Sequence, residues 1–266
     1  MTSTASGSRQ DRRTERQNAI ARAVMEHGSI RIEELAERFG ISVMTAHRDL
    51  DELEGRGLLR KSRGAATAQA STLVESSVVY RQTQQLEIKR SLAGTALRHV
   101  NTGQSVLLDD STTVHQIIPL LVDRAPLTVI TNSLSAINEV SNTDGLSLIG
   151  LGGEYYNWCA SFMGRVTNES IRRLHSDLLL MSAAAIIDQT VYFQASETVD
   201  TKRAMMDAAS VRILLADHTK FSGRALHACA ELREFDHVIV DHLTPRGVVE
   251  TLRRAGTDVT VVRPRR

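Results

Sequence analysis

Short runs of β-forming apolar residues alternate with helical segments through the C-terminal part of this 266-residue chain. The segments 113–122 and 199–209 have the length and residue pattern of connecting helices. Such alternation predicts an α/β domain built on an open, largely parallel, Rossmann-like sheet. The runs that we interpret as strands are Ser105–Leu108, Thr128–Ile130, Ser147–Ile149, Asp177–Met181, Val211–Leu215, Val238–Val240 and Val259–Val262.

The N-terminal part has a different, purely helical periodicity. Apolar residues recur at helical spacing over residues 19–24, and Gly28 follows as a stop signal. A second short stripe carries Ile32, Leu35, Ala36 and Phe39 and ends at Gly40. Ser42 is a good N-cap for a third helix that extends to about Glu54. Two short helices joined by a turn with glycine predict a helix-turn-helix in a small, α-rich domain.

The third helix has one polar face. At about 100° per residue, Val43, Ala46, Leu50 and Leu53 share the apolar side, and Arg48 points away from them. Met44 and Thr45 flank Arg48, and His47 lies nearer the buried edge. Arginine and threonine in the first turns of such a helix are suited to reading bases in the major groove. The alternative for Arg48 is a surface ion pair with Asp51 or Glu52.

A basic cluster follows this helix. Arg56, Arg60, Lys61 and Arg63 lie within eight residues that contain no acid. An apolar pair precedes most of the cluster and a glycine follows it, so we expect a β-hairpin wing whose cations contact phosphate, rather than a solvated basic loop. The expected DNA contacts are Ser42, Met44, Thr45, His47, Arg48, Arg60, Lys61 and Arg63.

Polar or glycine-rich segments follow three successive predicted strands: 109–113, 131–133 and 152–153. In open parallel sheets, ligands bind beyond the carboxyl ends of the strands. Hydroxyls and free backbone N–H groups at the start of a helix suit a phosphate. Helix capping by Ser111 or Thr112, and an ordinary turn at Gly152-Gly153, are the alternatives.

The N-terminal motif resembles a known family. The segments 36–50 and 53–60 resemble the winged helix-turn-helix of DeoR-family bacterial transcriptional regulators. Ala46 and His47 stand where the family favours isoleucine and arginine, which leaves the operator sequence open. The resemblance implies sequence-specific binding of double-stranded operator DNA.

The C-terminal part resembles the DeoR-family sensor domain over nearly its whole length. The residues that fall in the family's order and spacing are Lys89, Asp109–Thr113, Thr131-Asn132, Gly152-Gly153, Gly164, Asp177, Glu197 with Lys202, and Asp217–Phe221. This implies a fold related to ribose-5-phosphate isomerase and a phosphorylated sugar as effector. Lys202 and Lys220 become candidate charge partners of that effector; the alternatives are an exposed helix ion pair and a surface loop cation. Ser111 stands where glycine is common, and Ala183–Ala185 replace a glycine-rich or acidic segment. The expected effector contacts are Asp109, Ser111, Thr112, Thr113, Thr131, Asn132, Ser133, Gly152, Gly153, Glu197, Lys202 and Lys220.

The competing hypothesis is a sugar-phosphate isomerase or deaminase with an appended helical domain. Proton abstraction needs a carboxylate base at the substrate carbon, and the expected position after the fourth strand is the apolar segment Ala183–Ala185. Asp188 and Glu197 are better explained as loop and helix-start residues. We therefore expect a regulator without catalytic residues.

Several other classes are disfavoured. Nine histidines without ligand spacing and two cysteines predict no metal site, and we expect no cofactor. The longest nearly apolar stretch, Leu178–Ile187, is too short for a membrane span, and the first residues lack the apolar core of a secretory signal. Hydrophobic residues at 42% and a net charge of +1 indicate a folded protein that is not strongly basic. A cytoplasmic protein without membrane contacts is expected.

We predict four segments: a DNA-binding domain at 12–66, a linker at 67–86, a sensing domain at 87–245, and a C-terminal strand with a basic tail at 246–266. Since one helix-turn-helix covers only a half-site, a homodimer or higher oligomer is expected. The predicted function is a repressor of a carbohydrate-catabolism operon that a phosphorylated sugar releases from DNA.

Overall fold

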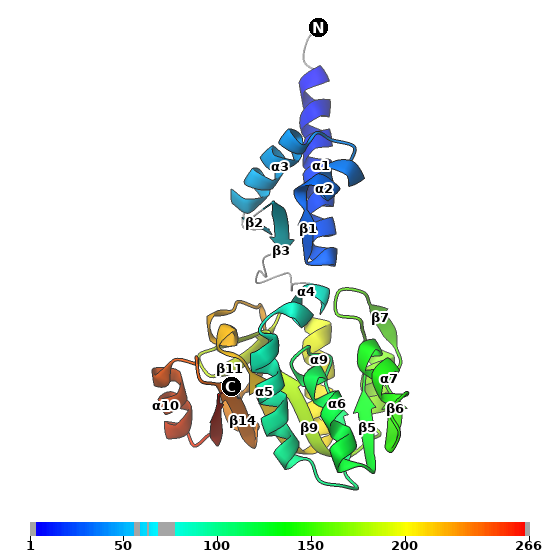
Figure 1. The fold of residues 1–266 in the computed structure, drawn as a ribbon, viewed down its shortest axis with the longest axis vertical. Helices are drawn as coiled ribbons and strands as arrows, with labels where there is room; N and C mark the ends of the chain where they lie inside the picture. The colour runs from blue at the N-terminus through cyan, green and yellow to red at the C-terminus, as the bar shows by residue number, and fades with distance from the viewer. Residues whose placement is uncertain (1–3, 56–58, 63, 69–77, 264–266) are drawn as a thin grey trace. The chain divides into compact units, whose positions relative to one another are not determined.

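The computed structural model describes residues 4–55, 59–62, 64–68 and 78–263. The chain divides into two compact units, Met1–Arg81 and Gln82–Arg266, which are described separately (Figure 1). None of the helices in these described ranges is long and apolar enough to cross a membrane.

The N-terminal unit combines three helices with a small antiparallel sheet. The helices are α1 (Thr4–His27), α2 (Ile32–Arg38) and α3 (Val43–Gly55). The strands β1 (Ser29–Arg31), β2 (Leu59–Ser62) and β3 (Ala65–Ala68) pair in the order β1-β3-β2. Ile20 and Val24 of α1 join the apolar stripes of α2 and α3 in one core. This is the predicted helix-turn-helix followed by a hairpin wing.

The prediction that Val43 lies on the buried apolar stripe of α3 is wrong. Ala46, Leu50 and Leu53 are fully buried, but Val43 is 43% exposed. Because helical side chains lean toward the helix N-terminus, Val43 projects past the first turn of α3 into solvent.

The C-terminal unit is built on a seven-stranded parallel sheet of order β15-β14-β12-β9-β4-β5-β6. Each strand covers one of the predicted runs. Their bounds are β4 Ser105–Leu108, β5 Leu127–Thr131, β6 Leu146–Gly150, β9 Ser176–Ser182, β12 Ala209–Ala216, β14 His237–Asp241 and β15 Val259–Val262. The predicted open parallel α/β sheet is therefore confirmed.

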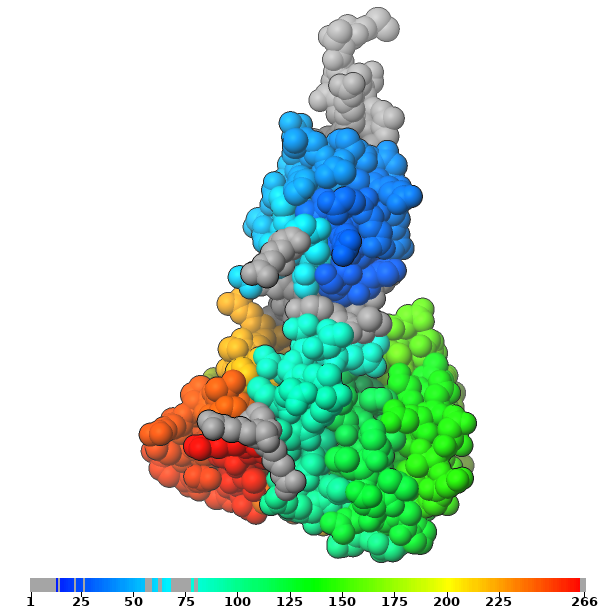
Figure 2. Space-filling model, viewed as in Figure 1, coloured from blue at the N-terminus to red at the C-terminus, as the bar shows by residue number. Residues whose placement is uncertain are grey.

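Alternate residues of the central strand face two separate cores. In β9, Leu178 and Leu180 pack with helices α5 (Leu86–Ala96), α6 (Ile118–Leu121) and α7 (Leu134–Val140). Leu179 and Met181 face the other core, with α8 (Arg165–Ile171), α9 (Ser196–Asp207) and α10 (Arg246–Arg254). Side chains fill the spaces between the helices of the first face (Figure 2). Burial on both faces explains why a central strand such as β9 is a nearly continuous apolar run.

The predicted helix at 113–122 is not one α-helix. It is divided into the 3-10 turn η2 (Val114–Ile117), α6, and the 3-10 turn η3 (Val122–Arg124). Pro119 lies in the first turn of α6, where its missing N–H cannot continue a hydrogen-bond ladder from the preceding turn.

The short antiparallel strands of the C-terminal unit were not predicted from the sequence. β7 (Glu154–Tyr156) pairs with β8 (Ser161–Met163), and a second sheet has the order β10-β11-β13. Its strands are β10 (Ala185–Ile187), β11 (Thr190–Phe193) and β13 (His227–Glu231). The remaining elements are α4 (Val78–Thr83), η1 (Leu97–His99), η4 (His218–Ser222) and η5 (Leu232–Glu234).

Candidate functional site

The recognition helix α3 begins at a side-chain cap. The backbone N–H of Thr45 donates to Ser42 Oγ at 3.1 Å, and the hydroxyl oxygens of these two residues lie 2.8 Å apart. Gly40 takes a positive φ of 60° in the turn before it. The turn and the cap set where α3 starts, and therefore which side chains its first turns present.

The first two turns of α3 carry an exposed face. Arg48 and Met44 are exposed, and Thr45 and His47 are half-buried. The alternative ion pairs of Arg48 are not formed, because Asp51 pairs with Lys61 and Glu52 pairs with Arg13. Among the described residues, the Arg48 guanidinium makes no ion pair, which leaves it available for a base edge.

A buried carboxylate behind this face was missed by sequence analysis. Asp49 is only 1% exposed and accepts hydrogen bonds from Arg16 Nε at 2.7 Å and Gln17 Nε2 at 3.1 Å. The hydrogen bond to Asp49 raises the pKa of Arg16. These bonds fix α3 to α1, and they join residues 32 and 33 positions apart, which helical periodicity does not indicate.

The wing presents fewer free cations than expected. Arg60 is exposed, whereas the Lys61 ammonium pairs with Asp51 of α3 and the Lys61 backbone N–H donates to Glu54 Oε1 at 2.9 Å. The wing strand β2 therefore binds the C-terminal half of α3. Arg63 lies outside the described residues.

In the C-terminal unit, a buried charged cluster lies at the carboxyl end of β4. Lys202 of α9 is 2% exposed; its Nζ lies 2.7 Å from Asp109 Oδ2 and also bonds Asp110. Burial alone would lower the pKa of Lys202, but the two carboxylates outweigh burial and raise it. The backbone N–H of Ser182 at the end of β9 donates to Asp109 Oδ2 at 2.9 Å. The alternative interpretation of Lys202, an exposed helix ion pair, is thus wrong.

Further predicted residues surround this cluster. Lys89 of α5 is 3% exposed and donates to Thr112 Oγ1 at 3.0 Å. Ser111 donates its hydroxyl to Asp109 Oδ1 at 2.5 Å and accepts the Val114 N–H at 3.1 Å. The Ser111 hydroxyl therefore satisfies the first N–H of η2, although the N-cap position itself is Thr113, whose side chain makes no capping hydrogen bond. Thr113 is also buried.

The end of β5 contributes an amide with an open acceptor. Asn132 is fully buried, and its Nδ2 donates to the Phe162 carbonyl at 2.8 Å. Its Oδ1 has no hydrogen-bond partner within the described part of the chain. Thr131 Oγ1 accepts the Ser133 N–H at 3.2 Å, and Ser133 Oγ accepts the Ala136 N–H at 3.4 Å as the cap of α7. An unsatisfied buried carbonyl oxygen marks a position where a ligand donor would be stabilising.

The glycine pair after β6 has a packing role. A Cβ at Gly153, where φ is 151°, would lie 2.0 Å from Thr167 Oγ1. That hydroxyl donates to the Gly152 carbonyl at 2.9 Å, which fixes this loop to α8. Gly152 itself is exposed with open space at its Cβ position.

Two remaining candidates lie apart from the buried ion pairs. Glu197 is exposed at the start of α9, where its carboxylate accepts the Ser196 hydroxyl at 3.2 Å. Lys220 is half-buried in η4, directly after β12, and its ammonium has no ion pair with a described residue. Asp217 caps η4 by accepting the Thr219 N–H at 3.0 Å. Lys220 is therefore a cation that remains available for an anionic ligand.

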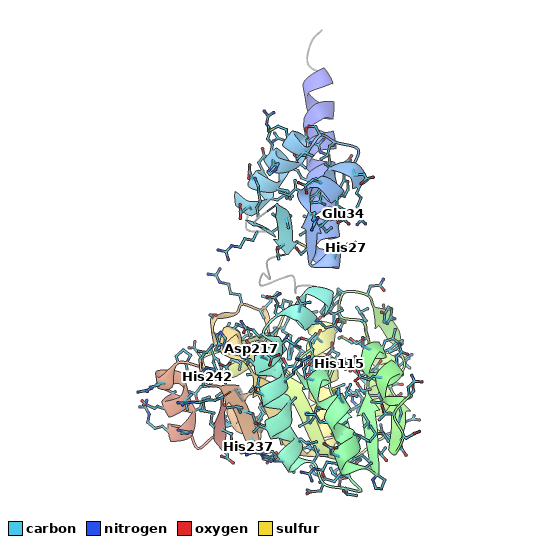
Figure 3. All side chains as sticks on the ribbon, viewed as in Figure 1. His27, Glu34, His115, Asp217, His237 and His242 are labelled. Atoms are coloured by element: carbon cyan, nitrogen blue, oxygen red, sulfur yellow. The ribbon has the colours of Figure 1, made fainter. Side chains whose placement is uncertain are left out.

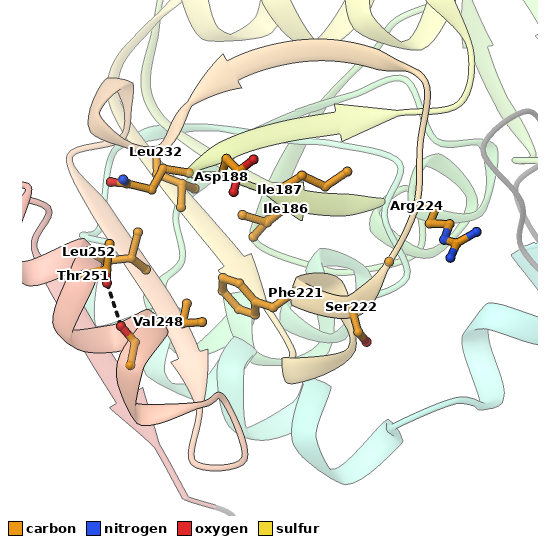
Figure 4. A pocket seen from close by; sticks show the side chains of 13 residues that line it. Ile186, Ile187, Asp188, Phe221, Ser222, Arg224, Leu232, Val248, Thr251 and Leu252 are labelled. Atoms are coloured by element: carbon orange, nitrogen blue, oxygen red, sulfur yellow. Dashed lines mark hydrogen bonds between the residues drawn. The ribbon is translucent and has the colours of Figure 1, made fainter.

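A cavity of about 630 Å³ lies between the β10–β11 turn, η4 and α10 (Figure 4). Its lining is largely apolar, with Ile186, Phe221 and Val248 on its walls and Asp188 and Arg224 among its polar residues. Arg224 projects away from the apolar residues in this view. The buried charged cluster does not line this cavity.

The histidines do not form a metal centre in the part of the chain that is described. His115, His237 and His242 are spread over the C-terminal unit (Figure 3). Across the described residues, no group of three or more His, Cys, Asp and Glu side chains could hold a metal ion.

Comparison with known proteins identifies both units. Residues 16–72 match the model of the DeoR-like helix-turn-helix domain, and residues 84–242 match that of the DeoR C terminal sensor domain. The chain is 32% identical to the transcriptional repressor AccR of Agrobacterium fabrum over 90% of this chain and 93% of that protein. It is 27% identical to the glycerol-3-phosphate regulon repressor of Escherichia coli over 91% of this chain and 96% of that protein.

A third relative is the lactose phosphotransferase system repressor of Staphylococcus epidermidis, 29% identical over 86% of this chain and 92% of that protein. Among solved structures, ribose-5-phosphate isomerase A of Methanocaldococcus jannaschii is 14% identical, with a TM-score of 0.39, over 52% of this chain and 55% of that chain. Similarity at this level says nothing about activity. The matches to both domain models and to full-length repressors lead to one conclusion: the chain belongs to the DeoR family of helix-turn-helix transcriptional regulators.

Proposed function

We propose that this protein is a repressor of a carbohydrate-catabolism operon, and that a phosphorylated sugar bound in its C-terminal unit releases it from operator DNA. The observation that carries the proposal is the cluster of Lys89, Asp109, Asp110 and Lys202 at the carboxyl edge of the parallel sheet. Burying four ionisable groups is costly, and clusters of this kind are concentrated at functional sites. One relative is named for glycerol-3-phosphate and another for a lactose phosphotransferase system, and these names support a small phosphorylated carbohydrate-derived metabolite as effector.

The effector phosphate would be bound outside the existing ion pairs. Lys202 is already neutralised by Asp109 and Asp110, so it is a poor partner for a further anion. Lys220 has no ion pair with a described residue and follows β12, which lies two strands from β4 in the sheet, and we assign the phosphate to it. Sugar hydroxyls would donate to Asn132 Oδ1, the buried acceptor without a partner among the described residues.

Operator binding is assigned to the exposed face of α3 and to the wing. Arg48 would form the bidentate contact with a base, and Ser42, Met44, Thr45 and His47 would complete the surface in the groove. Arg60, Lys61 and Arg63 would contact phosphates. We assign this activity to residues 12–66 and effector sensing to residues 87–245. The proposed linker, 67–86, contains the short helix α4, and the C-terminal segment, 246–266, begins with helix α10 before its strand and basic tail.

Coupling between the sites must be reciprocal. An effector changes DNA affinity only if it binds one conformation better than another, so operator DNA must weaken effector binding by the same factor. The protein would act as a homodimer or higher oligomer, because each helix-turn-helix covers one half-site. We propose no chemical step: Ala183, just after β9, and Ala185, the first residue of β10, are buried, and Asp188 lies in the β10–β11 turn with a φ of 46°.

The test is an effector screen followed by operator release. A panel of sugar phosphates is added to the full-length protein, and thermal shift and operator affinity are measured for each. At least one compound should raise the melting temperature and weaken operator binding, without being converted to product. The Lys220→Met variant should lose both responses, whereas Lys61→Met should keep the thermal shift. A panel in which compounds bind and turn over would instead support the enzyme hypothesis.

A further inference from the structure

We infer that Met44 is the centre of the base-reading surface and that it recognises thymine methyl groups next to the guanine read by Arg48. The inference rests on the proposed operator binding and names part of the sequence that the operator must contain. Met44 is 64% exposed, although it is a large apolar side chain in a helix whose other apolar residues beyond Val43 are buried. An apolar side chain left in water gains free energy when a partner covers it.

The position of Met44 on α3 identifies the surface that it belongs to. At about 100° per residue, Met44 lies between His47 and Arg48 around the helix axis. All three side chains are on the first two turns of α3, and Arg48 follows Met44 by one turn on the same face. Met44 is therefore in the middle of the polar residues that we assign to base contacts.

The wing leaves only this half of the helix free. Asp51 and Glu54, in the C-terminal half of α3, are bonded to Lys61 of the wing. These acidic residues would repel phosphate if they entered the groove, and their pairing with Lys61 holds them at the wing. The N-terminal half, with Met44 and Arg48, is the part that can approach bases, and Arg60 of the wing is exposed for a phosphate contact.

The chemistry of Met44 fits one feature of the major groove. Thymine is the base that presents a methyl group there, and guanine presents two acceptors to arginine. One helical turn separates Met44 from Arg48, about 5–6 Å along the axis, which corresponds to about two base-pair steps. Methionine is unbranched and adapts its shape to an apolar partner. The operator should therefore contain thymine within about two base pairs of the guanine that Arg48 reads.

The experiment removes the methyl group from the DNA. Duplexes that bind the full-length protein are selected from a random-sequence pool, and the selected duplex is resynthesised with uracil in place of thymine at each position in turn. Uracil lacks only the C5-methyl group. We expect a loss of affinity of about fourfold at one or two thymines near an essential guanine, the effect of one buried methyl group.

Two variants assign that effect to Met44. Met44→Ala should bind the thymine and uracil duplexes equally, whereas Met44→Leu should still prefer thymine. Val166→Ala removes a comparably exposed apolar side chain, 57% exposed on α8, and should leave the preference unchanged. Alanine is the strongest helix former, so Met44→Ala should keep α3 folded, and circular dichroism checks this.

Each result supports or overturns the inference. A selected duplex that tolerates uracil at every position overturns it while leaving operator binding intact. Retention of the thymine preference by Met44→Ala also overturns it, because another residue then contacts the methyl groups. A pool that yields no preferred sequence would overturn the proposed operator binding, and the assignment of Met44 with it.

Discussion

The two candidate sites differ in what surrounds their charged residues. On α3, Arg48 is exposed and forms no ion pair with a described residue. In the C-terminal unit, Lys202 is 2% exposed and bonds two carboxylates. DNA brings its own grooves and charges, so a protein that reads it needs only to present side chains on a rigid element. A site for a small ligand must enclose the ligand, so the side chains that line it are buried in the protein. Buried charged side chains are stabilised by bonding one another.

This difference also explains what the sequence could predict. The face of α3 follows from helical periodicity, which depends on neighbours three and four residues apart, and Arg48 lies where the periodicity put it. The bond between Lys202 and Asp109 joins residues 93 apart. Periodicity holds no information on such a pair. Lys202 was therefore predicted as a site residue from the family resemblance alone, and its ion pairs with Asp109 and Asp110 were not predicted.

The same reasoning applies to the fold. Central strands of the parallel sheet such as β9 and β14 were predicted because burial on both faces makes them nearly continuous apolar runs, whereas the edge strand β6 is partly exposed. β7, β8 and β10 have three residues each, which is too short for a periodic pattern. The segment at 113–122 looked like one helix because its apolar spacing is helical, and Pro119 acts through a missing hydrogen bond that spacing does not report.

The largest expected effect comes from removing the buried cation. Lys202→Met would remove the buried ammonium that bonds both Asp109 and Asp110, and we expect the C-terminal unit to lose about 3–5 kcal/mol of unfolding free energy. The single tryptophan, Trp158, lies in this unit, so its fluorescence in urea follows the transition.

A compensating variant separates lost charge balance from lost packing. Asp109→Asn and Asp110→Asn combined with Lys202→Met remove all three charges and should recover much of the lost stability. If Lys202→Met were as stable as the wild type, the cluster would be hydrated and the contrast with α3 would disappear.

The second effect is on operator binding alone. Arg48→Ala should weaken binding to the preferred operator by about 1–3 kcal/mol and relax discrimination at one base pair, because a bidentate base contact is lost. The urea transition of Trp158 should not move, since Arg48 is exposed and belongs to the other unit. Binding titrations on matched and mismatched duplexes measure both quantities. Arg165→Ala, an exposed arginine of α8, is the control, and an equal loss in that variant would exclude a groove contact by Arg48.

The helix cap gives a smaller effect within the N-terminal unit. Ser42→Ala removes the acceptor for the Thr45 N–H and should destabilise the start of α3 by about 1 kcal/mol. Hydrogen exchange of the Thr45 amide should become faster by about fivefold, the rate factor that corresponds to that free energy. Ser42→Asp keeps a capping oxygen and should restore protection. Unchanged exchange in Ser42→Ala would mean that another group caps α3.

Arg60 and Lys61 of the wing should differ slightly in how much each contributes to the salt dependence of DNA binding. Arg60→Ala should reduce the slope of log affinity against log salt by about 0.9, the value for one lost phosphate contact. Lys61→Ala should reduce it by less, because Lys61 already pairs with Asp51 and gains less from phosphate. Titrations at several salt concentrations measure the two slopes. Equal reductions would mean that the Lys61–Asp51 pair opens without cost when DNA binds.

The smallest expected effect is a pH-dependent change in unfolding free energy at the amino ends of β4 and β9, opposite the end that carries the charged cluster. Asp177 begins β9, where its Oδ2 accepts the backbone N–H and the hydroxyl of Ser105 at 2.8 and 2.7 Å. These bonds, the backbone one first, lower the pKa of Asp177. Because the folded-state pKa lies below the unfolded value, the Asp177 carboxylate adds stability above pH of about 4, and this contribution is lost as the pH falls through the folded-state pKa.

The measurement is the urea midpoint of wild type and Asp177→Asn at a series of pH values. The difference between the two should be largest near pH 6 and should shrink below pH of about 4. Asp177 is exposed, so the whole difference should stay well below that for Lys202→Met. This contrast extends the comparison to two carboxylates of the same unit. Asp109 is buried and depends on its ion pair with Lys202, whereas Asp177 is exposed to solvent and joins β9 to β4 by hydrogen bonds to Ser105. A difference that grew as the pH fell would mean that the protonated form of Asp177 is the better partner of Ser105, which would reverse the assigned direction.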